Sequence, residues 1–270
     1  MLPTVELLRG ASLQNKWTGF ALLVAAMLPV TVIAQNEEPY KSPWRTPWTY
    51  EQADHWSKLD PLYALCNTGE AQSPIDIRNA REERLPDLRF EFKNEPLRYV
   101  TNNGHTIRVN YHDAAGTGNV LMVGDKRYQL TQFHFHHPSE ENVDGKPFAM
   151  EIHLMFQAAD GEVAGVAVFV EPGAASRTIQ EIWQHMPRAE GQRAVTGVEI
   201  NPADLVPHSL KYYRYTGSQT APPCTEPVTW FVLKSPVELS TAQIKAFAEL
   251  YPHDVRPVQP LNGRIVRESR

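Results

Sequence analysis

Three histidines, His134, His136 and His153, have a spacing that suits a metal ion. The first two are separated by one residue, and on a β-strand residues two apart point to the same face. If the later segment around His153 forms a neighbouring strand, the three imidazoles converge on one point. Three neutral nitrogen ligands, with a fourth position left for water, are typical of catalytic zinc. The spacing therefore predicts a zinc site with an open position.

Two polar residues, Gln132 and Glu151, each precede a histidine of this group by two residues. Each shares a strand face with its histidine, so both are candidate acceptors for the outer ring N–H of a metal-bound imidazole. Phe133 and Phe135 indicate that the opposite face is core. The alternative is that the histidines simply face solvent. A third histidine beside a glutamate in an apolar segment favours the metal site, because buried ionisable groups are costly without partners.

The segments around these residues have the pattern of a mostly β domain. Period-two alternation of apolar and polar side chains predicts strands, and glycine- and asparagine-containing turns separate them. The predicted strands are 88–92, 106–111, 128–136, 150–157, 164–170 and 228–233. Helical patterning is weaker and predicts short helices at 178–186 and 240–251, the second capped by Ser240. We therefore expect a predominantly β domain with short peripheral helices.

The composition supports a single globular domain. The chain has 270 residues, of which 42% are hydrophobic and 21% charged, and this is ample for one sizeable core. Its 22 prolines suit a loop-rich or β-rich fold better than long helices. The formal net charge is -5, and no basic run extends beyond isolated pairs. We therefore expect no nucleic-acid partner.

The N-terminal segment has the pattern of an export signal. Arg9 and Lys16 precede an apolar stretch at 20–34, as in a secretory signal that is cleaved after Ala34. A membrane anchor is the alternative, although Pro29 interrupts a stretch that is shorter than the roughly 20 residues of a spanning helix. The predicted organisation is a signal peptide at 1–34, an extended arm at 35–47 and a catalytic domain at 48–270. The protein is then periplasmic or secreted.

The chain has two cysteines, Cys66 and Cys224. An export signal together with an even cysteine count predicts an oxidising compartment and one disulfide. The alternative is two buried free thiols.

Several further motifs, taken with the histidines, resemble the α-class carbonic anhydrases of the exported bacterial type. They occur in the same order as in that family, from about residue 44 to the C-terminus. The motifs are Trp48-Thr49-Tyr50, His55-Trp56, Gln72-Ser73-Pro74-Ile75-Asp76-Ile77, Asn102-Asn103-Gly104-His105, the three histidines, Ser139-Glu140 and GSQTAPPCTEPVTW at 217–230. The resemblance implies a single α+β domain built on a large, mostly antiparallel, twisted central β-sheet. Cys66 and Cys224 sit where bacterial members carry a disulfide.

The resemblance implies a zinc lyase that hydrates carbon dioxide reversibly to bicarbonate and a proton. The three histidines would hold Zn²⁺, and a zinc-bound hydroxide would attack carbon dioxide. By resemblance Thr220 accepts the hydroxide proton, Glu140 accepts the threonine proton, and His105 is the proton shuttle. Sulfonamides and small anions are the expected inhibitors, and a homodimer is a possible assembly.

The resemblance also implies a cavity around the metal. Its expected wall residues are Tyr50, Asn103, Met155, Gln219, Ala221, Val228 and Trp230, of which Tyr50 and Asn103 organise water. Gln219 stands where a leucine usually lines the carbon dioxide pocket, and Ala221 replaces a common threonine. Gly165 falls near a usual valine, and His137 follows the ligand pair where many members have tryptophan or an aliphatic residue. A glutamine in an apolar wall predicts a lower rate.

Two other classes of protein fit part of the pattern. His134, His136 and Glu140 have the spacing of a first cupin motif, which would suit iron and oxygen chemistry. The segment before His153 lacks the glycine- and proline-marked turn of a cupin, and residues 217–230 have no place in that family. A secreted zinc-binding or carbonic-anhydrase-like binding module is the second alternative. Zinc storage would not require Thr220 and Glu140, so their presence favours catalysis.

Overall fold

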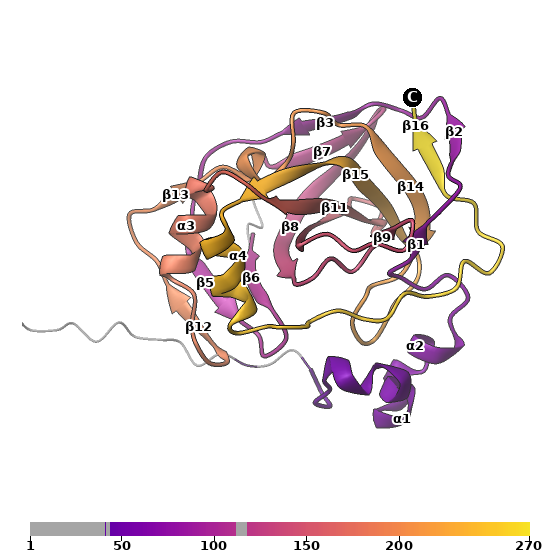
Figure 1. Ribbon diagram of the computed structural model, residues 1–270, viewed down its shortest axis with the longest axis horizontal. Coiled ribbons are helices and arrows are strands. Elements are labelled where there is room, and N and C mark those ends of the chain that lie inside the picture. Colours follow the sequence, from indigo (N-terminus) through magenta and orange to yellow (C-terminus); the bar gives the residue numbers. More distant parts are fainter. Residues whose placement is uncertain (1–40, 42–43, 112–117) are drawn as a thin grey trace, which may run out of the picture. The chain divides into compact units, whose positions relative to one another are not determined.

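A computed structural model describes residue 41 and residues 44–111 and 118–270 (Figure 1). The chain divides into two compact units, 1–35 and 36–270, and every described residue belongs to the second. The predicted signal peptide at 1–34 lies outside the described residues, as does most of the predicted arm. None of the helices in the described ranges combines the length and the apolar character that a membrane crossing requires.

One sheet of twelve strands dominates the described unit, in the order β12-β5-β6-β8-β10-β11-β15-β14-β16-β2, with β7 pairing β8 and β3 pairing β7. Its strands are β2 (Arg81–Glu83), β3 (Leu88–Glu91), β5 (Tyr99–Asn102), β6 (Ile107–Asn110), β7 (Val120–Val123), β8 (Lys126–His136), β10 (Met150–Ala158), β11 (Val163–Pro172), β12 (Gly191–Ala194), β14 (Tyr212–Gly217), β15 (Val228–Leu239) and β16 (Arg267–Ser269). All neighbours are antiparallel except β11–β15 and β2–β16, which are parallel. The predicted large, mostly antiparallel sheet is confirmed.

Two small sheets accompany the large one. β1 (Asp76–Ile77) pairs in parallel with β9 (Asn142–Val143), and β4 (Glu95–Pro96) pairs antiparallel with β13 (Glu199–Ile200). The β1–β9 pair lies next to the segment that contains Glu140 and Glu141, so it helps to fix that segment beside the central strands.

The central strands separate two packing environments because their side chains alternate. Phe133, Phe135, Ile152 and Leu154 are buried in the largest hydrophobic cluster, on one face of β8 and β10. Met155 belongs to a second apolar cluster on the other face. The histidines of β8 and β10 alternate with the phenylalanines and aliphatic residues, so they lie on the face away from the main core.

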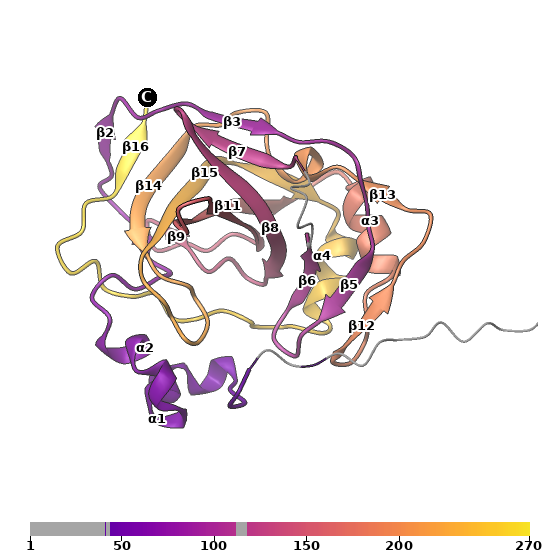
Figure 2. The same cartoon turned by 180° about the vertical axis from the view of Figure 1, so that it is seen from behind.

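The helices are short and peripheral, as predicted. They are η1 (Tyr50–His55), α1 (Trp56–Leu59), η2 (Pro61–Tyr63), α2 (Leu65–Thr68), α3 (Arg177–Gln184), η3 (Pro202–Leu205) and α4 (Thr241–Ala248), where η denotes a 3₁₀ helix. Ser240 caps α4, because its hydroxyl accepts a hydrogen bond of 3.2 Å from the Gln243 backbone N–H. In both views α3 and α4 lie together beside β5 and β12, whereas α1 and α2 lie apart from them (Figures 1 and 2).

A disulfide joins Cys66, in α2, to Cys224, in the loop between β14 and β15. The Cα atoms of the two residues are 5.0 Å apart. The predicted bridge is confirmed, and the alternative of two free thiols is wrong. The bridge ties the N-terminal helices to the loop at 218–227, which also contains Thr220.

Candidate metal centre and its cavity

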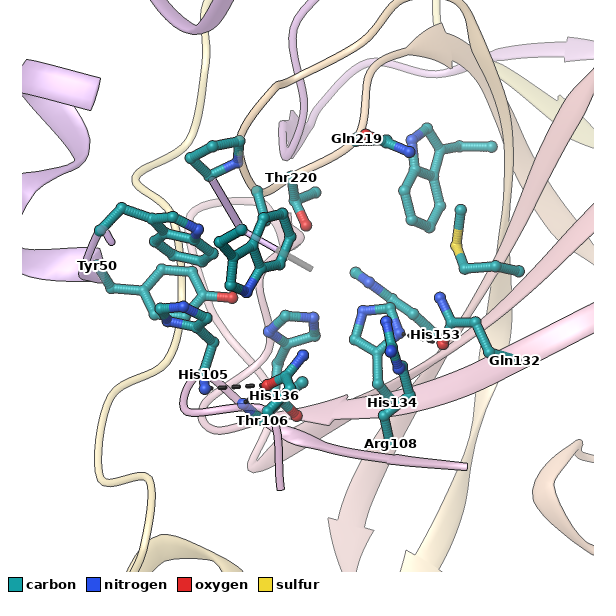
Figure 3. Close-up of a pocket in the computed structure, with 17 residues that line it drawn as sticks. Tyr50, His105, Thr106, Arg108, Gln132, His134, His136, His153, Gln219 and Thr220 are labelled. Carbon is teal, nitrogen blue, oxygen red and sulfur yellow. Dashed lines mark hydrogen bonds between the residues drawn. The ribbon is translucent and has the colours of Figure 1, made fainter. Parts of the chain in front are cut away.

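The three histidines converge because β8 and β10 pair in a register that places His134 directly opposite His153 and His136 opposite Glu151. Facing residues of an antiparallel pair point to the same side of the sheet. The ring centroids of the three imidazoles are 4.6 to 5.2 Å apart. One ring nitrogen from each lies within 4.8 Å of the other two. Figure 3 shows the rings grouped on the cavity floor, below Thr220.

His134 and His136 are each hydrogen-bonded through one ring nitrogen, Nδ1, on the outer side of the group. His134 Nδ1 donates to Gln132 Oε1 at 2.9 Å, and His136 Nδ1 donates to the backbone carbonyl of Asp254 at 2.8 Å. These bonds fix the tautomer and leave Nε2 to offer its lone pair. Nε2 of His136 and both ring nitrogens of His153 are buried and have no hydrogen-bond partner among the described residues. Nε2 of His136 and Nδ1 of His153 are therefore left for a zinc ion, whereas Nε2 of His153 faces the carboxylates of Glu141 and Glu151.

The electrostatics of the first two rings also suit metal binding. Burial, reinforced by the neighbouring imidazoles, holds the pKa values of His134 and His136 well below 6.5. Both rings are therefore neutral at physiological pH, and neutral imidazole is the form that coordinates a metal.

His153 lies against two buried carboxylates, those of Glu151 and Glu141. Its Nε2 is 3.7 Å from Glu151 Oε2 and 3.5 Å from Glu141 Oε2. Tyr215 donates to Glu141 Oε1 at 2.6 Å and holds that side chain in place. Burial lowers the pKa of His153, but the two nearby carboxylates of Glu141 and Glu151 outweigh burial and raise it to about 10. A metal ion bound by His153 would displace that proton, because only a deprotonated ring nitrogen coordinates a metal.

Glu140 lies beside the metal position and is fully enclosed. Its Oε1 accepts a hydrogen bond of 2.8 Å from the Arg256 backbone N–H, and its Oε2 is 3.4 Å from His136 Nε2. Burial raises the pKa of Glu140 to about 7, although the hydroxyl of Thr220 is among the groups that act in the opposite direction. The structure therefore brings Thr220 and Glu140 together.

A cavity of about 160 Å³ opens above the histidines (Figure 3). It is lined by Trp44, Trp48, Tyr50, Asn103, His105, Thr106, Arg108, Gln132, His134, His136, His153, Met155, Gln219, Thr220, Ala221, Pro222 and Trp230. Most of the residues expected in the wall are among these. Val228 is a correction: it begins β15 and is buried in the apolar cluster with Met155 and Trp230, so it does not line the cavity.

Two departures from the family pattern have a structural explanation. A Cβ atom on Gly165 would lie 2.6 Å from the ring of Trp230, its neighbour across the β11–β15 pair. The absence of a side chain on Gly165 therefore leaves room for the indole ring of Trp230. His137 faces away from the metal, because its ring Nδ1 donates to the Pro252 carbonyl at 3.0 Å. Gln219 remains on the cavity wall, where its side chain adds a polar group.

His105 follows a tight turn that Asn103 organises. Asn103 Oδ1 accepts from the backbone N–H groups of His105, at 2.9 Å, and Thr106, at 2.8 Å. The His105 ring stacks on Trp48 with a centroid distance of 3.6 Å and an interplanar angle of 5°. Trp44 presents an edge to the same ring at 5.7 Å. Burial among these rings lowers the pKa of His105 to about 4.

The low pKa of His105 gives a prediction for its titration. We expect a proton NMR titration of the ring to have its midpoint near pH 4, so that His105 is neutral throughout the range above about pH 5. His105→Gln identifies the resonance. Trp44→Ala exposes one side of the ring to water, and we expect it to move the midpoint upward toward 6.5. A midpoint of 6 or above in the unmodified protein would contradict this description.

Some residues of the site are not evident from the sequence. Asp254 supplies a backbone acceptor to His136, Trp48 stacks on His105, and Glu141 adds a second carboxylate behind His153. Arg108 lines the cavity beside His134. The sequence indicates only that Arg108 belongs to the predicted strand at 106–111, which follows His105.

Comparisons with known proteins agree with this geometry. Residues 51–270 match the sequence profile of the family described as eukaryotic-type carbonic anhydrase. A carbonic anhydrase from Klebsiella pneumoniae is 41% identical over 254 residues, which cover 92% of this chain and 97% of that protein. One from Pectobacterium carotovorum is 41% identical over 223 residues, covering 81% and 89%. The α-carbonic anhydrase from Thermovibrio ammonificans, solved with the inhibitor sulfanilamide, has a TM-score of 0.76 and 37% identity, covering 83% and 99%.

Proposed function

The chain belongs to the α-carbonic anhydrase family and hydrates carbon dioxide reversibly to bicarbonate and a proton, and we propose that His134, His136 and His153 hold the zinc ion that this reaction requires. The observation that carries the proposal is the convergence of three ring nitrogens within 4.8 Å, with the outer nitrogens of His134 and His136 hydrogen-bonded. As is well established for carbonic anhydrases, zinc would lower the pKa of a water molecule from far above the neutral range to about 7 and make hydroxide available at neutral pH.

Thr220 and Glu140 orient the attacking oxygen in this proposal. The Thr220 hydroxyl donates its hydrogen bond to the buried carboxylate of Glu140. The threonine oxygen can then accept a hydrogen bond from another group. The oxygen that attacks carbon dioxide must then donate to Thr220, so its lone pair points into the cavity. The Arg256 backbone N–H supports the arrangement, because it occupies the other carboxylate oxygen of Glu140 at 2.8 Å.

The walls of the cavity give the substrate an apolar place beside the histidines. Trp230 and Met155 supply that surface, and the indole N–H of Trp230 is held by the Ser218 carbonyl at 3.0 Å. Ala221 widens the wall where a larger residue is common in the family. Gln219 brings an amide to the same wall, and it admits water that a leucine would exclude.

His105 carries the proton out of the cavity in this proposal. Its ring lies with Tyr50 on one side of the cavity, away from Gln132 (Figure 3). Because its pKa is about 4, accepting a proton from a donor of pKa about 7 is uphill, so the ring is protonated only transiently and direct transfer to buffer competes with it. Proton transfer then depends on the buffer concentration more strongly than it would with a shuttle of pKa 6.5.

We also propose export to the periplasm or the extracellular space. The predicted signal peptide at 1–34 and the Cys66–Cys224 disulfide support this location, because disulfides persist in oxidising compartments. A homodimer remains a prediction from the resemblance.

Stopped-flow carbon dioxide hydration by the zinc-loaded protein tests the proposed function. We expect rapid hydration that sulfanilamide suppresses, since a sulfonamide takes the open position on the metal. The same protein is assayed with and without added buffer to reveal the proton-transfer step. Absence of hydration from folded protein that holds one zinc per chain would overturn the proposed site.

A further inference from the structure

Met155 places an oxidisable sulfur atom in the wall of the metal cavity. It lies on β10 two residues after His153, so the two side chains share one face of the strand. Of the described residues that line the cavity, Met155 alone contains sulfur. It is 9% exposed, whereas His153 is fully buried. The wall beside the metal position therefore includes a thioether that a small molecule in the cavity can reach.

The neighbouring strand β11 presents no side chain to Met155. Met155 faces Gly165 across the β10–β11 pair, and Gly165 faces Trp230 across the β11–β15 pair. A Cβ atom on Gly165 would lie 2.6 Å from the Trp230 ring, so the indole ring covers the backbone at this glycine. Met155 and Trp230 belong to one apolar cluster, and both line the cavity. The thioether and the indole therefore form one apolar surface beside the histidines.

The other methionines in the described part of the chain have different surroundings. Met150 and Met186 are packed in the largest hydrophobic cluster, and their exposed fractions are 0% and 4%. Met122, on β7, is half-buried and lies outside the cavity. The oxidation of methionine by a peroxide depends on access to the sulfur atom. A peroxide therefore reaches Met122 from bulk solvent and Met155 through the cavity, whereas the core shields the other two.

Hydrogen peroxide converts a methionine thioether into a sulfoxide. The sulfur lone pair attacks one peroxide oxygen, the O–O bond breaks and an S–O bond forms. The displaced hydroxide takes up the proton of the transferred oxygen and leaves as water, so sulfur is oxidised and the peroxide is reduced. The product carries a polar oxygen that accepts hydrogen bonds, where the thioether was apolar. Such an oxygen in the cavity wall would hold water at the surface that carbon dioxide requires.

We propose that Met155 is a site of oxidative modification, at which hydrogen peroxide forms methionine sulfoxide and lowers the rate of carbon dioxide hydration. The inference rests on the proposed function, because the activity that falls is hydration at the metal position. Zinc stays bound in the oxidised protein, since the outer ring nitrogens of the three histidines face groups other than Met155. Oxidation thus acts on the surface for the substrate and leaves the metal in place.

The test treats the zinc-loaded protein with a series of hydrogen peroxide concentrations. Peptide mass mapping gives the fraction of sulfoxide at each methionine, and the same samples are assayed for hydration and for zinc content. We expect the two accessible methionines, Met122 and Met155, to be oxidised well before the two in the core. We also expect kcat/KM for hydration to fall by about tenfold as Met155 becomes fully oxidised, while the zinc content stays constant.

Three variants separate Met155 from other effects of peroxide. Met155→Leu replaces the thioether by an apolar side chain of similar volume, and Met155→Val repeats the test with a smaller one. We expect peroxide to leave each of these variants close to its own starting rate. Met122→Leu is the matched control, because it removes the other accessible thioether, which lies outside the cavity. We expect it to lose activity with peroxide as the unmodified protein does.

The outcomes distinguish this modification from the proposed function. If both Met155 variants lose activity with peroxide as fast as the unmodified protein, the proposal is overturned and the proposed function stands. Protein that is fully oxidised at Met155 and keeps its kcat/KM would overturn it as well, as would a loss of hydration while Met155 stays reduced. If the untreated, zinc-loaded protein does not hydrate carbon dioxide, the proposed function fails, and the mass map alone then decides whether Met155 is the modified residue.

Discussion

Replacing His134 by alanine is expected to remove zinc from the protein and to lower carbon dioxide hydration by at least about 10³-fold. One of three converging nitrogens is lost, and the remaining two cannot hold the ion in a tetrahedral site. His134 is the best ligand to remove, because its ring is the least buried of the three and its outer partner is a neutral amide. Truncating His153 would leave Glu141 and Glu151 buried beside an empty space, and such uncompensated charges threaten the fold.

The measurement pairs zinc content by mass spectrometry with stopped-flow hydration on the same samples. Circular dichroism confirms that the variant remains folded. His208→Ala is the control, because His208 is exposed and lies outside the cavity. We expect it to retain both zinc and activity. A folded His134→Ala protein that keeps one zinc per chain and full activity would show that the metal lies elsewhere.

Loss of the Cys66–Cys224 disulfide is expected to lower the free energy of unfolding by about 2–5 kcal/mol. The bridge closes a loop of 158 residues, and the chain-entropy relation gives about 5 kcal/mol for a loop of that length. For a domain of this size, a loss of 2–5 kcal/mol corresponds to a fall in Tm of roughly 5–20 °C. Activity should fall too, because Cys224 and Thr220 share one loop and the Cys224 backbone N–H donates to the Ala221 carbonyl at 2.9 Å.

Urea unfolding and hydration rates, each with and without reductant, check this expectation. The double variant Cys66→Ser with Cys224→Ser should match the reduced protein and should not respond further to reductant. That insensitivity separates the disulfide from other effects of the reductant, including its binding to zinc. Equal stability of the oxidised and reduced proteins would contradict the assigned role of the bridge.

Local patterns predict much of this fold because they determine which way each side chain points. The alternation of phenylalanine and histidine before His136 predicts a strand with one core face and one polar face, and β8 has that arrangement. The predicted segments at 150–157 and 164–170 likewise correspond to β10 and β11. Short outer strands, such as β12 at one edge of the sheet and β16 beside the edge strand β2, carry no such signal, because their side chains are only half-buried and pairing rather than packing defines them.

The sequence alone does not predict the parts of the site that depend on tertiary contacts. The hydrogen-bond acceptor for His136 Nδ1 is the backbone carbonyl of Asp254, 118 residues away in the chain. Any residue type can supply a backbone carbonyl, so the sequence does not indicate this partner. Arg108 joins the site through the register of β6 against β8, which the turn and the core packing determine. The resemblance to the family places Val228 in the wall, but a motif match does not tell a cavity wall from the apolar layer beside it, where Val228 is buried.

The pairing of β8 with β10 also has a consequence for the order in which the protein assembles. His134 and His153 are 153 - 134 = 19 residues apart in the chain and meet across one neighbouring strand pair. The parallel partner strands β11 and β15 join Val163 to Val228, 228 - 163 = 65 residues apart, and Arg256 reaches Glu140 across 116 residues. Contacts between segments far apart in the chain form late. Closing a long loop costs conformational entropy before the contacts that stabilise the loop have formed. A newly synthesised chain can thus bind its metal before the segment that contains Arg256 has packed against Glu140, so metal binding and the completion of the catalytic site are separate steps in its folding.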